Sequence, residues 1–147
     1  MYTSIKKFSE LTTNELYDIL QLRNKCFIVD QQVAYQDLDN YDKESYHFII
    51  YDGGSSSLAA YARVIKPNIR FEEPSLGRVC IDKQYRDGTY FNEIYKEVIR
   101  WGDFLGYKVW RAILQKEYWS IWKRKGWEID KEIIEDGVES YEVILRR

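Results

Sequence analysis

The sequence predicts a mixed α/β fold in which a central sheet carries helices on both of its faces. Three observations lead to this class. Short segments rich in β-branched and aromatic residues alternate with longer segments whose apolar residues recur every three or four positions. A glycine–serine run, 53–57, separates two strand-like segments. A strand, a basic turn and an amphipathic helix then follow one another without a break between Gly77 and Gly106.

The N-terminal half begins with a short strand, 5–8, and a helix. Thr12 and Glu15 stand at the spacing of a capping box that opens this helix, and apolar residues give it one buried face: Leu16, Ile19, Leu20 and Phe27. Beyond the helix the chain turns polar and its periodicity fades, which predicts a loop. Strands over 47–51 and 58–66 then form an antiparallel hairpin across the glycine–serine turn.

The C-terminal half contains the next strand, 74–81, and then the amphipathic helix. A fifth strand covers 109–114, and a short helix follows over 118–125. The remaining segment, 127–145, predicts two strands joined by an Asp-Gly turn at 136–137. The order β, α, three β, α, β, α, two β places helices on both faces of a mixed sheet.

The composition is that of one globular domain covering residues 1–147. Of the 147 residues, 45% are hydrophobic and 31% are charged, which is enough for a proper core. The net charge of -2 gives no global field that would favour nucleic acid or an anionic membrane surface. The first thirty residues contain no continuous apolar run, so we expect neither a signal peptide nor a transmembrane segment, and a cytoplasmic location.

Cysteine and aromatic residues add two further expectations. Cys26 and Cys80 each lie in an apolar segment, and one such pair does not make a disulfide framework, so buried free thiols are expected. The chain contains 13 Tyr, 5 Trp and 6 Phe, which fill cores and interfaces or stack on sugars and bases. Core and dimer packing is the expected use, and the aromatic strands near the C-terminus favour a homodimer.

The basic turn at 83–88 is a candidate phosphate site. A strand that feeds a helix through a turn with Arg86 and Gly88 leaves unpaired N–H groups and the positive end of the helix dipole directed outward. Such a site suits a phosphate or pyrophosphate. The same unit is also the commonest one in α/β domains, and most examples bind nothing. Both interpretations stay open on these residues alone.

The order of elements resembles the fold of the Gcn5-related N-acetyltransferase (GNAT) superfamily. Residues 20–39, LQLRNKCFIVDQQVAYQDLD, resemble the ElaA-like branch, which typically shows an LR..VF.VEQ…YQD.D pattern there. Other pieces match in the same order along almost the whole chain: AYAR at 60–63, GRV at 77–79, Gln115, and EDG at 135–137. The N-terminal stretch is the specific part of the resemblance.

This resemblance implies direct transfer of an acetyl group from acetyl-CoA to a primary amine of a small molecule or peptide, without a metal. It implies that the fourth and fifth strands separate, and that the pantetheine arm of the donor pairs with the open edge formed by Val79, Cys80 and Ile81. It also implies a pyrophosphate site at the turn and the helix start, formed by Arg86, Asp87, Gly88, Thr89 and Phe91.

The chain departs from the superfamily at two places. Of the Q/R-x-x-G-x-G/A pattern only Arg86 survives, and Thr89 and Phe91 replace small residues that let phosphate oxygens approach the backbone. Gly88 offers an alternative permissive position one residue earlier. Trp122 stands where many members have a tyrosine that protonates the departing thiolate, a role that an indole N–H cannot fill.

Candidate residues for the chemistry follow from these departures. Tyr118, one helical turn before Trp122, is the candidate acid, with a packed aromatic side chain as the alternative. The backbone N–H of Cys80 or Ile81 is the candidate donor to the oxyanion. His47, the only histidine, is a candidate base, with a structural role at a strand end as the alternative.

The polar loop is the expected acceptor pocket, because its acidity suits a cationic amine. The candidate residues are Asp30, Gln31, Gln36, Asp37 and Arg63. Asp37 is also a candidate base, although turn and cap roles suit a short carboxylate equally well. Arg63 lies within a strand, where a charge needs a partner, and bridging to the loop aspartates is its alternative role.

The sequence therefore predicts an N-acetyltransferase that uses acetyl-CoA to acetylate an amine: a polyamine, an amino sugar, an antibiotic or a protein terminus. Two alternatives stay open. The first is a noncatalytic protein of the same fold with a degenerate acetyl-CoA site, which binds a partner or ligand through its aromatic surface. The second is transfer from a different acyl-CoA, with Phe91 and Trp122 reshaping the cleft.

Overall fold

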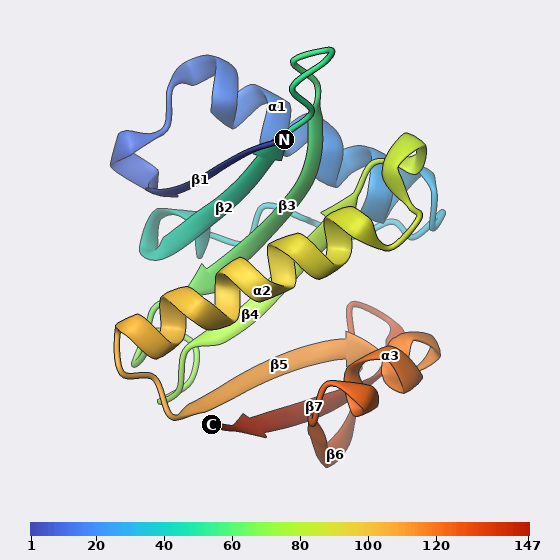
Figure 1. The fold of residues 1–147 in the computed structure, drawn as a ribbon. Coiled ribbons are helices and arrows are strands. Elements are labelled where there is room, and N and C mark those ends of the chain that lie inside the picture. The colour runs from blue at the N-terminus through green and yellow to red at the C-terminus, as the bar shows by residue number, and fades with distance from the viewer.

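A seven-stranded mixed sheet forms the centre of the computed structural model, which describes all residues, 1–147 (Figure 1). The strands lie in the order β1-β2-β3-β4-β5-β7-β6, and every neighbouring pair is antiparallel except β4 and β5. The strands are β1 Tyr2–Lys7, β2 Ser45–Tyr51, β3 Leu58–Ile65, β4 Ser75–Ile81, β5 Val109–Gln115, β6 Glu128–Glu135 and β7 Val138–Arg146. The predicted mixed α/β class is confirmed.

Helices cover both faces of this sheet, with α2 crossing one face and α1 lying on the other (Figure 1). The α-helices are α1 Thr13–Arg23, α2 Thr89–Phe104 and α3 Trp119–Arg124. The chain continues from α1 into a π-helical segment, η2 Asn24–Val29, and single 3₁₀ turns form η1 Phe8–Glu10, η3 Asp42–Glu44, η4 Lys83–Tyr85 and η5 Lys116–Tyr118. No helix combines the length and the apolar character that a membrane crossing requires.

The core has two parts, one on each face. The larger part lies under α2, whose Ile94 and Val98 are fully buried against residues of the sheet that include Trp110 of β5. Gly102 of α2 contacts the Trp110 ring so closely that a Cβ at this position would overlap it. The smaller part lies under α1 and η2 and comprises Ile19, Leu22, Cys26, Ile49, Leu58, Tyr61 and Cys80.

Two predicted local features are present. Thr12 Oγ1 accepts a hydrogen bond of 3.1 Å from Glu15 N, and Thr12 N donates one of 2.8 Å to Glu15 Oε1, which is the expected capping box. Asp136 and Gly137 have φ of 53° and 79°, as the two-residue turn between β6 and β7 requires. The first strand begins at Tyr2, three residues earlier than predicted, because the exposed β1 continues to pair with β2.

A β-bulge interrupts the pairing of β3 with β4. The ladder pairs Tyr61 with Cys80 and Arg63 with Gly77, so two residues of β4 stand opposite one residue of β3. Arg78 is one of these two residues, and its φ of 50° lies in the left-handed region. The bulge turns the Arg78 side chain toward the loop that precedes η3.

The β4 and β5 strands share a single residue pair, Ser75 with Arg111. This pair lies near the start of both strands, so the strands diverge toward their C-terminal ends. Backbone groups along the rest of β4 therefore lack a partner strand on the β5 side.

Candidate active site

A cavity of about 530 Å³ opens where β4 and β5 diverge. Its walls come from β4, β5, segment 26–35, the residues around α3 and the hairpin between β6 and β7. Hydrophobic residues make up 16 of the 25 that line it. An apolar cavity with a few polar groups is the usual form of a small-molecule site.

The open edge of β4 presents Ile81 to this cavity. Asp82 N donates a hydrogen bond of 2.9 Å to Ala59 O in the direction of β3. The backbone N–H and C=O groups of successive strand residues point to opposite edges of the strand. The backbone groups of Ile81 therefore face the gap, and those of Cys80 face β3. The Cys80 N–H, one of the two predicted oxyanion donors, therefore lies on the β3 side, away from the cavity. The alternative donor, Ile81 N–H, faces the cavity.

Arg86 lies across this open edge. Its Nε donates a hydrogen bond of 2.8 Å to Ile81 O, and its Nη2 lies 3.2 Å from Asp30 Oδ2. Cys26 Sγ also lies 3.5 Å from Ile81 O and 3.5 Å from Arg86 Nη2. The side chain predicted to bind phosphate is thus held at the β4 edge by contacts within the protein.

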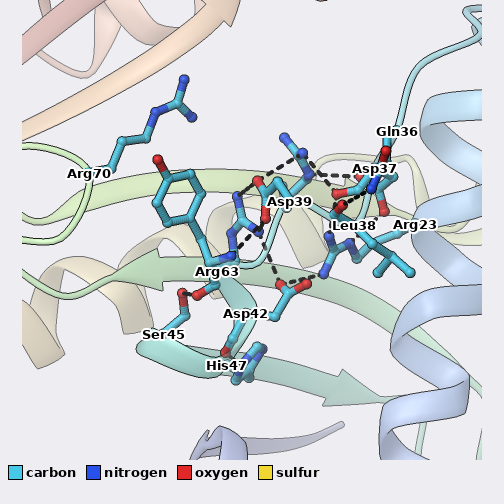
Figure 2. Close-up of polar contacts among 12 residues, drawn as sticks. Arg23, Gln36, Asp37, Leu38, Asp39, Asp42, Ser45, His47, Arg63 and Arg70 are labelled. Atoms are coloured by element: carbon cyan, nitrogen blue, oxygen red, sulfur yellow. Dashed lines mark hydrogen bonds and ion pairs between the residues drawn. The ribbon is translucent and has the colours of Figure 1, made fainter.

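Behind the β4 bulge, a buried cluster of three arginines and three aspartates joins the polar loop to the sheet: Arg23, Arg63, Arg78, Asp37, Asp39 and Asp42. Figure 2 shows its central contacts. Arg23 Nη1 lies 2.7 Å from Asp42 Oδ1, and Arg63 binds both carboxylate oxygens of Asp39 at 2.8 Å. Arg78 Nε lies 2.7 Å from an oxygen of Asp37.

These pairings favour the ionised form of Asp39 and of Asp42. Burial alone would raise the pKa of Asp39, but the hydrogen bonds and charge of Arg63 outweigh it and lower that pKa to about 2. Burial likewise opposes the ionised form of Asp42, and Arg23 and Arg63 together lower its pKa. The cluster therefore carries three positive and three negative charges, each neutralised within the protein.

Three predicted site residues fall outside the cavity wall because of this cluster and its loop. Asp37 is bound by Arg23 and Arg78, and its side chain is only 12% exposed. Arg63 is fully buried and bridges the loop aspartates, which was its alternative role. Gln36 points away, with its amide donating to Leu38 O. None of the three lines the cavity.

His47 lies beneath the same cluster and does not reach the cavity. It is 1% exposed; its Nε2–H donates to Asp42 O at 2.8 Å, and its Nδ1 accepts from the Tyr61 hydroxyl at 2.7 Å. Burial lowers its pKa, which favours the neutral ring that this pair of hydrogen bonds needs. The structure thus gives His47 its alternative, structural role, and the prediction of a catalytic base is not supported by its position.

Three other predicted residues lie together in the cavity wall: Asp30, Gln31 and Tyr118. Gln31 Oε1 accepts a hydrogen bond of 3.0 Å from Gln115 Nε2, which links segment 26–35 to the end of β5 across the cavity. The Tyr118 hydroxyl lies beside Gln31, and burial raises its pKa, so the phenol keeps its proton.

The predicted phosphate turn contains both a permissive and an obstructing feature. Gly88 precedes α2 with φ of 97°, so it occupies the left-handed position. The Thr89 N–H, however, donates to Asp87 Oδ1 at 2.9 Å, so a carboxylate occupies the first N–H group of the helix. Phe91 lines the cavity and packs against Trp122 with a centroid distance of 6.4 Å. Asp87, Gly88 and Thr89 lie outside the cavity wall.

Several lining residues were not predicted as site residues, among them Cys26, Tyr35, Glu135 and Asp136. Glu135 and Asp136 belong to the EDG segment at 135–137, and its match to the family pattern before the last strand could have indicated them as site residues. Cys26 reaches the cavity through the π-helical turn η2, and no sequence pattern marks such a turn. Asp136 differs from the other acidic residues of the wall because it forms no ion pair.

Comparison with known proteins places the chain in a family. No family model matches it. It is 32% identical over 118 residues to the protein ElaA of Escherichia coli, covering 77% of each chain. It is 37% identical over 83 residues to a UPF0039 protein of Synechocystis, a match that spans 56% of this chain and 53% of that protein.

Two solved structures have the same fold. An acyl-CoA N-acyltransferase from Pseudomonas aeruginosa superimposes with a TM-score of 0.89 at 23% identity, over 98% of both chains. The crystal structure of Escherichia coli ElaA gives a TM-score of 0.88, also at 23% identity, over 99% of this chain and 100% of that chain. The fold and the gap between β4 and β5 thus define a GNAT acyl-CoA N-acyltransferase fold.

Among proteins of that fold, the family is decided by sequence identity, and the identity to ElaA extends over more than two thirds of both chains. The chain belongs to the ElaA-like family, and it has the GNAT fold. The resemblance noted in residues 20–39 is confirmed.

Proposed function

We propose that this protein transfers an acetyl group from acetyl-CoA directly to a primary amine of a small molecule or peptide. The observation that carries this proposal is the open edge of β4 beside an apolar cavity of about 530 Å³. Strand edges pair readily with extended amide-containing chains, and pantetheine is such a chain. The acyltransferases that share the fold support the same assignment.

In this proposal the donor lies along β4, with its thioester carbonyl at the end of the gap. Val79 and Ile81 supply backbone hydrogen bonds, and Ile81 N–H stabilises the oxyanion that forms when the amine attacks. The donor would replace Arg86 at Ile81 O, which frees the guanidinium to contact the pyrophosphate. The apolar walls exclude water and so protect the thioester.

The acceptor approaches from the end of the cavity where Asp136 lies. A carboxylate without an ion pair favours a cationic substrate, whose ammonium group loses a proton to water before it attacks. Tyr118 keeps its proton at neutral pH and is the group we assign to protonate the departing thiolate. The transfer forms the amide C–N bond and breaks the thioester C–S bond in one active site.

The second candidate function, noncatalytic binding by a degenerate GNAT fold, is favoured by the α2 turn. Asp87 already occupies the Thr89 N–H and would repel a phosphate, while Phe91 fills space beside the turn. If these groups prevent donor binding, the cavity would hold a different ligand.

Calorimetric titration with acetyl-CoA and with free CoA separates the two functions. We expect micromolar binding to the wild-type protein and weaker binding to Arg86→Ala. Arg100→Ala is the matched control, because Arg100 is exposed on α2 and pairs only with Glu97. Binding that is absent up to millimolar concentration would contradict the donor assignment and favour the noncatalytic alternative.

We further propose that the protein acts in the cytoplasm as a homodimer. Its two cysteines are buried free thiols, which is typical of a reducing compartment. Light scattering of the purified protein tests the dimer, and a monomeric mass at micromolar concentration would contradict it.

A further inference from the structure

The two cysteines of the chain meet at the wall of the cavity, although they come from separate elements. Cys26 belongs to η2 and Cys80 to β4, and both belong to the smaller core cluster under α1. Both are buried, both line the cavity, and neither forms a disulfide. The two side chains belong to the same buried cluster, and Cys26 Sγ lies 3.5 Å from the carbonyl oxygen of Ile81, the residue that follows Cys80. The cavity therefore gives a small molecule access to a pair of adjacent thiols.

The surroundings of the two thiols differ. Cys26 Sγ lies 3.5 Å from the Arg86 guanidinium, whereas Cys80 Sγ receives no hydrogen bond from a positive side chain. The neighbouring Cys80 and the Arg86 guanidinium outweigh burial and lower the pKa of the Cys26 thiol. Burial raises the pKa of the Cys80 thiol. One thiol is thus suited to react first as a thiolate, and the other to stay protonated beside it.

We propose that Cys26 and Cys80 are a modification site at which a hydroperoxide forms an intramolecular disulfide. The Cys26 thiolate attacks one peroxide oxygen, giving a sulfenic acid and releasing water or an alcohol after protonation. The Cys80 thiol then attacks the sulfenic sulfur, the S–S bond forms, and the sulfenic hydroxyl leaves as water with the Cys80 proton. The thiol pair loses two electrons, and the peroxide is reduced.

The disulfide would hold η2 against β4 at the open edge. Cys26 already contacts Ile81 O, the group at which the donor would have to replace protein contacts. A covalent bond to Cys80 keeps Cys26 at that edge, so the oxidised protein binds the donor more weakly. This consequence rests on the proposed function, whereas formation of the disulfide does not.

Thiol counting and intact mass after treatment with hydrogen peroxide test the disulfide. Because Cys26 and Cys80 are the only cysteines, we expect both alkylatable thiols to disappear together, the mass to fall by about 2 Da, and dithiothreitol to restore both. In Cys80→Ser the reaction stops at Cys26 as a sulfenic acid that dimedone traps, and in Arg86→Gln it is slower. Two thiols that survive while Met1 is oxidised, or a disulfide between two molecules, would overturn the proposal.

Titration with CoA before and after peroxide tests the consequence. We expect the affinity of the wild-type protein to fall on the order of tenfold and to return with dithiothreitol. The affinity of the Cys26→Ala variant for CoA should be the same before and after peroxide treatment. Disulfide formation with unchanged affinity would overturn the blocking effect. If the reduced protein does not bind CoA, the proposed function fails, and the thiol count alone still decides the disulfide.

Discussion

Charged residues are used in opposite ways on the two sides of β4. In the buried cluster behind the bulge, Arg63 and its partners neutralise one another at distances of 2.7–3.2 Å. In the cavity, Asp30 and Arg86 form a partly exposed pair of 3.2 Å, and Asp136 has no partner. The difference indicates that the cluster fixes the loop and the bulge, whereas the cavity charges remain available to a ligand.

Removing one member of the buried cluster should have the largest effect. Arg63→Ala leaves Asp39 and Asp42 short of a positive partner, and we expect a loss of about 3–5 kcal/mol in the free energy of unfolding. The melting temperature should fall on the order of 10 °C in calorimetry. Arg100→Ala, which removes an exposed arginine from α2, should change it by about 1–2 °C at most. Equal shifts would remove the contrast between the two regions.

Removing the cavity phenol should affect turnover and leave the fold intact. Tyr118→Phe deletes the proton donor assigned to the thiolate, and we expect kcat to fall about tenfold with little change in KM. Stopped assays of CoA release with an amine substrate measure this. Tyr17→Phe is the control, because Tyr17 is exposed on α1. An unchanged kcat would show that the thiolate leaves without this acid.

Relieving the obstruction near the turn should strengthen donor binding. Phe91→Ala opens space beside the start of α2, and we expect the affinity for CoA to rise about three- to tenfold. Phe104→Ala, at the exposed end of the same helix, is the matched control. Weaker binding in Phe91→Ala would mean that the ring forms part of the donor site.

The smallest effect should appear in acid. Because Arg63 lowers the pKa of Asp39 to about 2, the stabilisation from this carboxylate is complete above pH ~4 and is lost as the pH falls from about 4 toward about 2. Asp39→Asn has no such carboxylate, so its stability should fall less over this window. Urea unfolding at several pH values measures both slopes, and parallel slopes would contradict the assignment.

The sequence predicted the fold because local signals agreed with one another. The Thr12 capping box, the hairpin around the glycine–serine run and the Asp-Gly turn at 136–137 each act over a few residues. Residues 20–39 then identified the branch, which the identity to ElaA confirms.

The candidate site was less predictable because its geometry depends on long-range packing. Asp37 and Arg63 look like polar pocket residues in the sequence, and only the folded loop shows that they bind partners in the buried cluster. The direction of the Cys80 N–H depends on the register of β3 and β4, which a strand sequence does not contain. Cys26 reaches the cavity through a π-helical turn, which also has no sequence signature.

The single backbone pair between Ser75 and Arg111 has a mechanical consequence. The sheet consists of two half-sheets, β1 to β4 and β5 to β7, which are joined at the Ser75–Arg111 end and diverge toward the other end. The amide hydrogens of Val79 and Ile81 lie in the gap between β4 and β5, without a neighbouring strand to slow their exchange with solvent. Slower deuterium uptake at these two residues would therefore report any molecule that occupies the gap, whatever its chemistry.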